Sequence, residues 1–467
     1  MAEAFDVVII GGGPGGYVCA IRSAQLGFKT ACIESRATLG GTCLNVGCIP
    51  SKNLLNLSEN FSKAKKNFSS VGIEIGKLTL NLSKMMKTKE KTVTILTKGI
   101  EFLFKKNKVT YIKGHASFKS NNEITVQEKS FQKTYKANRI IISTGSVPAS
   151  LPGIKIDEKI IVSSTGALSF DKVPKELVII GGGYIGLEMG SVWKRLGSNV
   201  TVIEFLDHIA SGIDKDMSSE FLKILKKQEI NFKLNSKVIG VSITKDKAVV
   251  NYISNETSAR KKIEADKVLI AVGRKPYTEG LNLKKVSVKS DNQGRIQIDN
   301  KFQTSVKNIY AIGDVIGGSM LAHKAEEEGI AVAEIIAGQS GHVNYNMIPM
   351  AIYTSPEVAS VGKTEQQLIE ENIKYKIGKF PFMANPRAKV INETEGFVKI
   401  LAEEKNDKVL GAHIIGPHAG DMIAEMVLAM EFGASSEDIA RTCHAHPTYS
   451  EAIKEAALAV DKRPIHS

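Results

Sequence analysis

Two cysteines near the N-terminus are the residues best suited to redox chemistry. Cys43 and Cys48 lie in the segment GGTCLNVGCIPSK, which spans residues 40–52. Residues five positions apart on a regular helix are separated by a rise of about 7.5 Å, whereas a disulfide needs Cα atoms within about 7 Å of each other. The two thiols can therefore form a redox pair only if the chain bends, which Gly47 permits. Two unpaired thiols are the alternative.

A helix is expected to begin near Pro50, because proline is favoured in the first helical turn. A thiol at that helix start, close to Lys52, should have a lowered pKa and form a thiolate readily. Cys19, Cys32 and Cys443 have no such setting and are expected to be small core residues. Five cysteines in 467 residues indicate free thiols and at most one redox pair, not a disulfide scaffold.

A repeated glycine motif indicates which elements position these thiols. A buried-strand pattern leads into GGGPGG at residues 11–16 and into GGGYIG at residues 181–186. In both copies a helical stretch follows, and then a second strand that ends in an acid, Glu34 or Glu204. The acid follows the third glycine by 18 residues in both copies, and the copies are offset by 170 residues. This repetition predicts two Rossmann-like dinucleotide-binding folds.

Each glycine of this motif has a physical purpose. The first glycine permits a tight turn, the second lets the backbone approach a pyrophosphate, and the third allows the helix to pack closely on the strand. The pyrophosphate then lies at a helix N-terminus, where unpaired N–H groups favour anions. Each acid can accept hydrogen bonds from an adenosine ribose. A 2′-phosphate would instead meet the Glu204 carboxylate, and no arginine follows in residues 205–208, so NAD is favoured over NADP.

Length and composition set the remaining limits. At about 150 residues per domain, 467 residues suggest about three domains, and 43% hydrophobic with 24% charged residues is typical of globular enzymes. No apolar run approaches the ~20 residues of a membrane helix, and no targeting pattern is visible, so we expect a cytoplasmic, bacterial protein or a mature mitochondrial-matrix form. The lysines behind the net charge of +13 are interpreted as solvated surface without nucleic-acid binding. Nine histidines without ligand spacing predict no metal site.

Several segments together resemble the pyridine nucleotide-disulfide oxidoreductases. They are the two glycine loops, the GGTCLNVGCIPSK segment, NIYAIGD at 308–314 and HAHPT at 444–448. The resemblance covers essentially the whole chain and implies an α/β fold with two Rossmann-like domains and an α+β C-terminal domain. The implied domains are an FAD-binding domain at 1–149, an NAD-binding domain at 150–276, a central domain at 277–345 that completes the FAD site, and a dimerisation domain at 346–467.

The same resemblance assigns roles to matching positions. It makes Cys43 the sulfur that exchanges with the substrate and Cys48 the sulfur beside the flavin, with His446 as general base and Glu451 as its orienting carboxylate. His444 is expected to be structural. The implied flavin contacts are Gly11, Gly13, Gly16, Glu34, Thr42, Lys52, Ala116, Thr144, Gly145, Ser146, Asp314, Met320, Leu321, Ala322 and His323. The implied nicotinamide-nucleotide contacts are Gly181, Gly183, Gly186, Glu188, Glu204, Val238 and Gly273, with Glu188 also a candidate partner for Lys52.

The activity implied is oxidation of dihydrolipoamide with NAD. The nearest alternative is an NADPH-dependent disulfide reductase of the glutathione reductase kind. A flavoprotein scaffold for docking is disfavoured, because docking needs neither the cysteine pair nor the histidine. The implied partners are a second copy of the chain, whose disulfide His446 would reach, and either lipoyl-bearing acyltransferases of 2-oxoacid dehydrogenase complexes or the glycine cleavage lipoyl protein. Two positions depart from the family pattern: Ala210-Ser211-Gly212 replaces a proline-containing turn, and Pro386 replaces a commoner serine.

Overall fold

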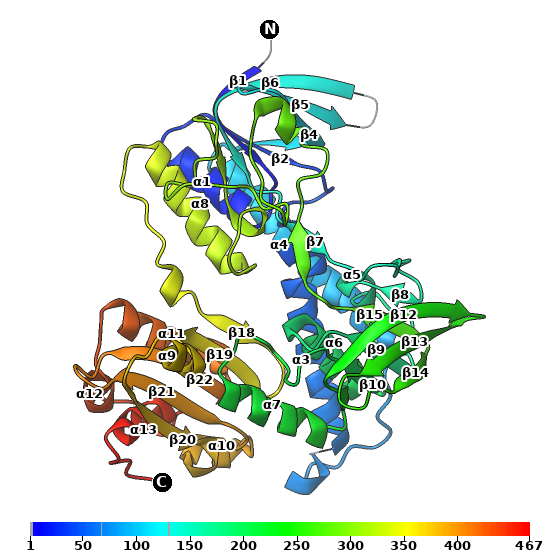
Figure 1. Cartoon of the computed structure of the whole chain (residues 1–467), viewed down its shortest axis with the longest axis vertical. Coiled ribbons are helices and arrows are strands. Elements are labelled where there is room, and N and C mark those ends of the chain that lie inside the picture. The colour runs from blue at the N-terminus through cyan, green and yellow to red at the C-terminus, as the bar shows by residue number, and fades with distance from the viewer. Residues whose placement is uncertain (1–2, 67, 129–130) are drawn as a thin grey trace. The chain divides into compact units, whose positions relative to one another are not determined.

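The computed structural model describes residues 3–66, 68–128 and 131–467, which form two compact units (Figure 1). The first unit combines the chain up to Asn53 with residues 83–149 and 273–343, and the second combines residues 54–82, 150–272 and 344–467. Each unit contains one of the two glycine loops. The predicted α/β fold class is confirmed, while the domain boundaries given above stay predictions.

A seven-stranded sheet forms the core of the first unit. Its order is β3-β2-β1-β6-β5-β4, and β17 pairs with the last residues of β6. The neighbours of β1 and β2 are parallel, whereas β4 and β5 are antiparallel. The central strand is fully buried over residues 7–10, as expected for a strand with both faces covered. The strands are β1 (Glu3–Ile10), β2 (Thr30–Glu34), β3 (Thr110–Lys113), β4 (His115–Ser120), β5 (Glu123–Glu128), β6 (Phe131–Ile142) and β17 (Ile309–Ala311).

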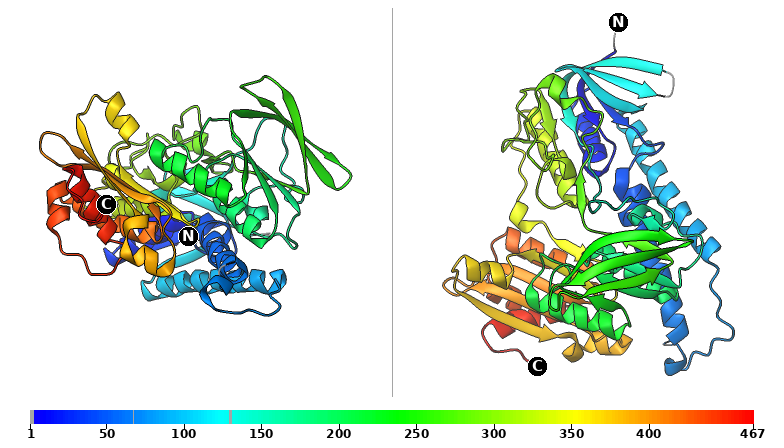
Figure 2. Two further views of the ribbon diagram at one scale, coloured as in Figure 1. Left: turned by 90° about the horizontal axis from the view of Figure 1, so that it is seen from below. Right: turned by 45° about the vertical axis from the view of Figure 1, so that its right-hand side comes forward.

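Helices α1 and α8 pack side by side in this unit, as both views show (Figures 1 and 2). A small antiparallel ribbon of β7 and β16 lies beyond the end of β6. Helix α3 begins in the first unit and ends in the second. The elements are α1 (Pro14–Gln25), α2 (Gly41–Val46), α3 (Cys48–Lys66), α4 (Leu82–Lys106), β7 (Ser146–Pro148), β16 (Arg274–Pro276), η2 (Leu283–Val286), η3 (Gly313–Val315) and α8 (Ala322–Ile336). The short helix η1 (Ser69–Val71), between α3 and α4, belongs to the second unit.

The second glycine loop belongs to a five-stranded parallel sheet with the order β11-β10-β9-β15-β8. A three-stranded antiparallel sheet, β12-β13-β14, packs against it and shares one apolar core that includes Val178 and Val250 (Figure 2). The elements are β8 (Ile161–Val162), α5 (Ser164–Ala167), β9 (Glu176–Ile180), α6 (Tyr184–Leu196), β10 (Asn199–Ile203), α7 (Lys215–Lys227), β11 (Asn231–Lys233), β12 (Ser236–Thr244), β13 (Lys247–Ser254), β14 (Arg260–Ala265) and β15 (Lys267–Ile270).

A second antiparallel sheet, in the order β18-β19-β22-β21-β20, forms the C-terminal part of the second unit. Helices α11 and α13 pack on it through small and apolar residues such as Met426 and Ala456. The elements are η4 (Tyr345–Met347), β18 (Met350–Ile352), β19 (Glu357–Gly362), α9 (Glu365–Glu370), β20 (Tyr375–Pro381), η5 (Phe382–Ala384), α10 (Pro386–Ile391), β21 (Phe397–Glu403), β22 (Val409–Gly416), α11 (Ala419–Glu431), α12 (Ser436–Arg441) and α13 (Glu451–Val460). Within the described ranges, every helix is too short or too polar to cross a bilayer.

Candidate active site

The first glycine loop has the geometry that the sequence predicts. Gly11 follows β1 with φ +107°, and a side chain there would lie 2.2 Å from the Ser143 carbonyl oxygen. A Cβ on Gly16 would lie 1.8 Å from the carbonyl oxygen of Gly11, so the start of α1 can pack here only without a side chain. Gly13 has more room, since the nearest atom to its Cβ position is the Gly41 Cα at 3.7 Å. The loop thus leaves open the position where a pyrophosphate would approach.

The acid at the end of β2 also holds this loop. Glu34 Oε2 accepts a hydrogen bond from the Gly12 amide at 2.9 Å, and Oε1 accepts one from the Arg36 amide at 2.8 Å. The Glu34 residue is only 5% exposed. The sequence predicted a carboxylate for a ribose, and the structure adds a second role for it in fixing the glycine turn.

The second glycine loop repeats the arrangement. Gly181 has φ +108°, and a Cβ on Gly186 would lie 2.3 Å from the Gly181 carbonyl oxygen. Glu204 Oε2 accepts a hydrogen bond from the Gly182 amide at 2.6 Å. Apart from its chain neighbours and its own helix, no heavy atom of the residues that the structure describes comes within 4 Å of the Cβ position on Gly183. Both predicted strand–glycine loop–helix units are therefore present, and both fit a dinucleotide phosphate.

Other predicted flavin contacts gather at the carboxyl end of β6 in the first unit. The Ser146 hydroxyl donates to Asp314 Oδ2 at 2.5 Å, and the Thr144 hydroxyl donates to the Tyr277 carbonyl at 2.5 Å. Arg274, which the sequence analysis did not assign, donates from Nε to Ser146 Oγ at 2.7 Å. The sequence signal that could have pointed to Arg274 is its position directly after Gly273, a predicted nucleotide contact. The remaining candidates lie on β4 (Ala116), in the loop after β6 (Gly145), near the start of α8 (Met320, Leu321, Ala322, His323), on α2 (Thr42) and on α3 (Lys52).

The cysteine pair lies where two helices meet. Cys43 is on α2, Cys48 is the first residue of α3, and Gly47 between them has φ −139° and ψ −115°. A side chain on Gly47 would come within 2.8 Å of the Thr42 carbonyl oxygen, so the close return of the chain depends on glycine. The predicted bend is confirmed. The predicted helix start near Pro50 is also confirmed, because α3 begins at Cys48 and has Pro50 in its first turn.

The structure holds the two cysteines as thiols in mutual contact. Both residues are half-buried. The hydrogen bond with Cys48, together with burial, raises the pKa of the Cys43 thiol, while the charge of Lys52 acts to lower it. The start of α2 touches the first glycine loop, because a Cβ on Gly41 would lie 2.6 Å from the Gly13 Cα. The thiol pair is therefore next to the predicted flavin nucleotide site.

The predicted base and its carboxylate are in contact in the second unit. His446 Nδ1 lies 2.8 Å from Glu451 Oε1, and the Thr448 amide donates to Glu451 Oε2 at 2.7 Å. Burial acts to raise the pKa of Glu451, but the Thr448 amide and the His446 ring outweigh it and leave that pKa lowered. The His446 side chain is 68% exposed. An exposed imidazole with one nitrogen on a carboxylate can take a proton at the other.

His444 has a different environment from His446. Its Nε2 lies 2.7 Å from Glu425 Oε1 on α11, its Nδ1 lies 2.9 Å from the Thr442 carbonyl, and its side chain is 6% exposed. The hydrogen bond to Glu425 raises the pKa of His444. With both nitrogens engaged, it fits the structural role predicted for it.

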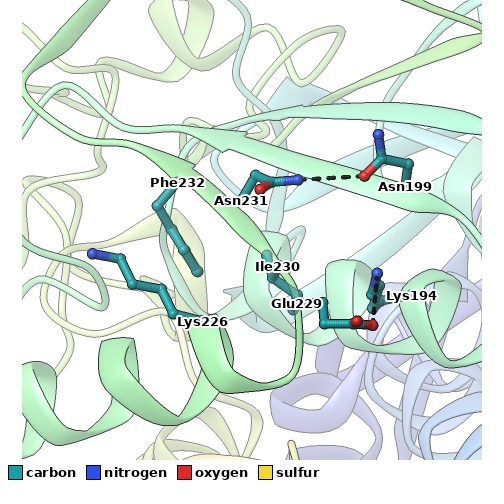
Figure 3. Close-up of a pocket in the computed structure, with 7 residues that line it drawn as sticks. All are labelled: Lys194, Asn199, Lys226, Glu229, Ile230, Asn231 and Phe232. Carbon is teal, nitrogen blue, oxygen red and sulfur yellow. Dashed lines mark hydrogen bonds and ion pairs between the residues drawn. The ribbon is translucent and has the colours of Figure 1, made fainter.

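The other predicted nicotinamide contacts lie on separate elements, namely α6, β12 and the loop after β15. Glu188 is buried on α6 and its Oε1 accepts a hydrogen bond from the Tyr353 amide at 3.0 Å; its pairing with Lys52 stays a prediction. Val238 is on β12 and Gly273, with φ +108°, follows β15. A hollow of about 440 Å³ in the second unit lies beside the first residues of β10 and β11 (Figure 3). The second glycine loop follows the last residue of β9, which is the other end of this parallel sheet. The position of the hollow separates it from the glycine loop. Its lining residues are Lys194, Asn199, Lys226, Glu229, Ile230, Asn231 and Phe232.

A charged cluster in the second unit has no counterpart among the predicted sites. Lys399 Nζ lies 2.9 Å from Asp214, 3.1 Å from Asp216 and 2.6 Å from Glu365. The three carboxylates are close enough to share a cation, and the buried ammonium of Lys399 supplies it. Asp214 also caps α7 and accepts a hydrogen bond from the Glu365 amide at 3.0 Å. This cluster ties the helix of the second dinucleotide fold to the C-terminal antiparallel sheet.

Comparison with known proteins identifies relatives along the full chain. The model of the pyridine nucleotide-disulphide oxidoreductase family matches residues 5–329, and the model of its dimerisation domain matches residues 348–457. The mitochondrial dihydrolipoyl dehydrogenase of Pisum sativum is 56% identical over 462 residues, covering 99% of this chain and 92% of the relative. That of Caenorhabditis elegans is 54% identical over 456 residues, covering 97% and 92%.

A second name occurs among these relatives. The leghemoglobin reductase of Glycine max is 54% identical over 460 residues, covering 98% of this chain and 88% of the relative. Among solved structures, the Cu(II) complex of the HOCl-induced flavoprotein disulfide reductase RclA from Escherichia coli matches with a TM-score of 0.87 and 26% identity, covering 98% of this chain and 99% of that one.

Proposed function

We propose that this chain, which belongs to the pyridine nucleotide-disulphide oxidoreductases, is a dihydrolipoyl dehydrogenase that uses FAD and NAD. It oxidises dihydrolipoamide to lipoamide and reduces NAD. The observation that carries the proposal is the contact of the Cys43 and Cys48 thiols directly beside the first glycine loop. A dithiol–disulfide couple at a dinucleotide site is what electron transfer between a dithiol substrate and a nucleotide requires.

The thiol chemistry follows from the roles proposed for four side chains. His446 takes the proton of a substrate thiol at Nε2, while Glu451 on Nδ1 orients the ring and stabilises its positive charge. The substrate thiolate attacks the sulfur of Cys43 in the Cys43–Cys48 disulfide, and Cys48 leaves as a thiolate. The second substrate thiolate then displaces Cys43, giving lipoamide and the reduced pair. FAD held at the first glycine loop would supply the redox chemistry that carries the electron pair of the reduced cysteines onward to NAD as a hydride.

Glu204 supports NAD as the nucleotide of the second fold. Its carboxylate lies at the glycine loop, where the 2′-phosphate of NADP would bring a like charge close to it. This favours the dihydrolipoamide reaction over the NADPH-dependent disulfide reductase alternative.

The working form is proposed to be a homodimer, which the match of residues 348–457 to the dimerisation domain supports. The proposed partners are lipoyl-bearing acyltransferase subunits of 2-oxoacid dehydrogenase complexes or the lipoyl protein of glycine cleavage. For location we keep the bacterial cytoplasm as the expectation and the mitochondrial matrix as the alternative. The mitochondrial relatives support that alternative. Cell fractionation decides between the two.

The test is a substrate comparison on the purified, FAD-loaded protein. We expect turnover of dihydrolipoamide with NAD at a kcat/KM at least about tenfold above that with NADP. A tenfold ratio corresponds to about 1.4 kcal/mol of repulsion between the Glu204 carboxylate and the 2′-phosphate. Cys48→Ser should keep FAD and lose dithiol oxidation, because no disulfide can form. A colourless protein, faster reduction of glutathione disulfide by NADPH, or full turnover by C48S would each refute the proposal.

A further inference from the structure

A buried asparagine contacts the loop that carries the proposed base. Asn385 is fully buried at the start of α10 in the second unit. Its Nδ2 donates to the Thr448 carbonyl at 3.0 Å, and its Oδ1 accepts from the Ala388 amide at 2.9 Å. One partner is an acceptor and the other a donor, so the orientation of the side-chain amide is fixed by its surroundings.

Thr448 connects Asn385 to both sides of the histidine. The Thr448 amide donates to Glu451 Oε2 at 2.7 Å, and the other carboxylate oxygen of Glu451 contacts the His446 ring at 2.8 Å. The Thr448 hydroxyl donates to the Ala445 carbonyl at 2.7 Å. Thr448 thus fixes both the backbone before His446 and the Glu451 carboxylate that orients the imidazole. Asn385 in turn fixes the position of Thr448.

The turn that bears Asn385 is itself held against the C-terminal antiparallel sheet. The Asn385 amide donates to the Phe382 carbonyl at 2.9 Å, and Phe382 is fully buried. A Cβ on Gly416, the last residue of β22, would lie 2.1 Å from the Phe382 ring, so the ring occupies the place of a side chain. The same ring meets Tyr449 edge-on with centroids 6.4 Å apart. The turn therefore contacts the 445–451 loop at two successive residues, Thr448 and Tyr449.

We propose that Asn385 is a positioning residue for the His446–Glu451 pair. The inference rests on the proposed function, in which His446 is the base for the dithiol. The chemistry of the position requires an amide, because the side chain must donate to a carbonyl and accept from an N–H at once. An ionised aspartate can only accept, and a serine can cap α10 but cannot reach Thr448. Without the hydrogen bond from Asn385, Thr448 and the Glu451 carboxylate lose their fixed position behind the imidazole.

The experiment compares two reactions of the FAD-loaded dimer carrying N385D or N385S. One reaction is dihydrolipoamide oxidation by NAD, and the other is NADH-dependent reduction of a soluble quinone, which needs neither thiol substrate nor base. We expect the ratio of dithiol to quinone kcat to fall about tenfold or more, since small misplacement of a catalytic group is costly. The KM for NAD should not change. The N385D deficit should shrink as the pH falls and its carboxyl group gains a proton it can donate, while the N385S deficit should not.

Ser435→Ala is the matched control, because the Ser435 side chain caps α12 through its hydrogen bonds with Asp438. It should lower the unfolding temperature without altering the ratio. If N385D and N385S both keep the wild-type ratio, Asn385 is only a helix cap and the inference fails. If the wild-type protein itself does not oxidise dihydrolipoamide, the proposed function fails, whatever the variants do. If N385S does not fold, the pH dependence of N385D decides alone.

Discussion

The two glycine loops share one backbone conformation but differ in how closely the rest of the chain covers them. Gly11 and Gly181 have φ values of +107° and +108°. The first loop has α2 against it, with Gly41 touching Gly13, whereas no described residue beyond the loop and its own helix comes within 4 Å of the Cβ position on Gly183. A covered loop suits a nucleotide that stays bound, and an open loop suits one that exchanges in every turnover. The difference therefore matches FAD in the first fold and NAD in the second.

The loops also differ in how their folds are anchored. Helix α1 of the first fold packs on α8, and a Cβ on Gly15 would lie 2.9 Å from the Ala325 carbonyl oxygen. The second fold is held instead by a buried charge, since Asp214 at the start of α7 contacts Lys399. Apolar and backbone packing fixes the first fold, and a charged cluster fixes part of the second.

The largest effect should come from filling the third glycine position in each loop. Gly16→Ala places a methyl group 1.8 Å from the Gly11 carbonyl oxygen, so we expect protein without bound flavin and without any activity. Gly186→Ala, with 2.3 Å to the Gly181 carbonyl oxygen, should keep the flavin and lose NAD binding by about 100-fold or more. Flavin absorbance per protein and an NAD titration measure the two. Loss of flavin in G186A would show that the loops do not serve separate nucleotides.

Removing the buried cation should be the next largest change. Lys399→Met leaves three carboxylates without their ammonium, and breaking a buried ion pair from one side costs about 3–5 kcal/mol. Urea unfolding of the second unit reports the loss. Lys376→Met is the control, because the pair of Lys376 with Asp461 is exposed to solvent on both sides and such pairs contribute little to stability. Equal effects of the two variants would contradict the anchoring role of Lys399.

A pH-dependent effect is expected from His413, which is fully buried near the same cluster. Burial lowers the pKa of His413 to about 4, whereas an unfolded histidine has a pKa near ~6.5. Between these values the unfolded chain binds a proton that the folded chain does not, so stability falls as the pH drops from about 6.5 to about 4, by up to ~3 kcal/mol. His413→Gln removes this titration. The variant should show a flatter dependence of unfolding free energy on pH in that window, and an unchanged slope would refute the assignment.

The smallest effect should come from Ala210, which donates to the Gly182 carbonyl at 2.8 Å with φ +50°. The residue that makes the same bond in the first fold is Gly40, which donates to the Gly12 carbonyl at 2.8 Å with φ +97°. Ala210→Gly should relieve backbone strain of about 1–2 kcal/mol and cost roughly 0.5–1 kcal/mol in chain entropy, which leaves a net gain of about 0–1.5 kcal/mol. Thermal unfolding measures it. A clear loss of stability would mean that the methyl group packs usefully.

Local spacing made much of this structure predictable. The two glycine loops, their acids and the bend at Gly47 depend on residues that are close in sequence, and the structure contains all of them. Contacts between residues far apart in the sequence could not be predicted from local spacing. Lys399 and Asp214 are 185 residues apart, and Asn385 and Thr448 are 63 residues apart. The second function of the acids was also invisible, because a strand that ends in glutamate looks the same whether the carboxylate meets a ribose or a backbone amide.

The hydrogen bond from Gly182 to Glu204 limits how the coenzyme preference of this enzyme can be redesigned. Replacing the acid with a small or basic residue to admit a phosphorylated ribose would also release the amide of the turn that cradles the pyrophosphate. A successful redesign would have to provide a new acceptor for that amide at the same time. Single substitutions aimed at the adenosine end should therefore weaken both coenzymes before they favour the new one.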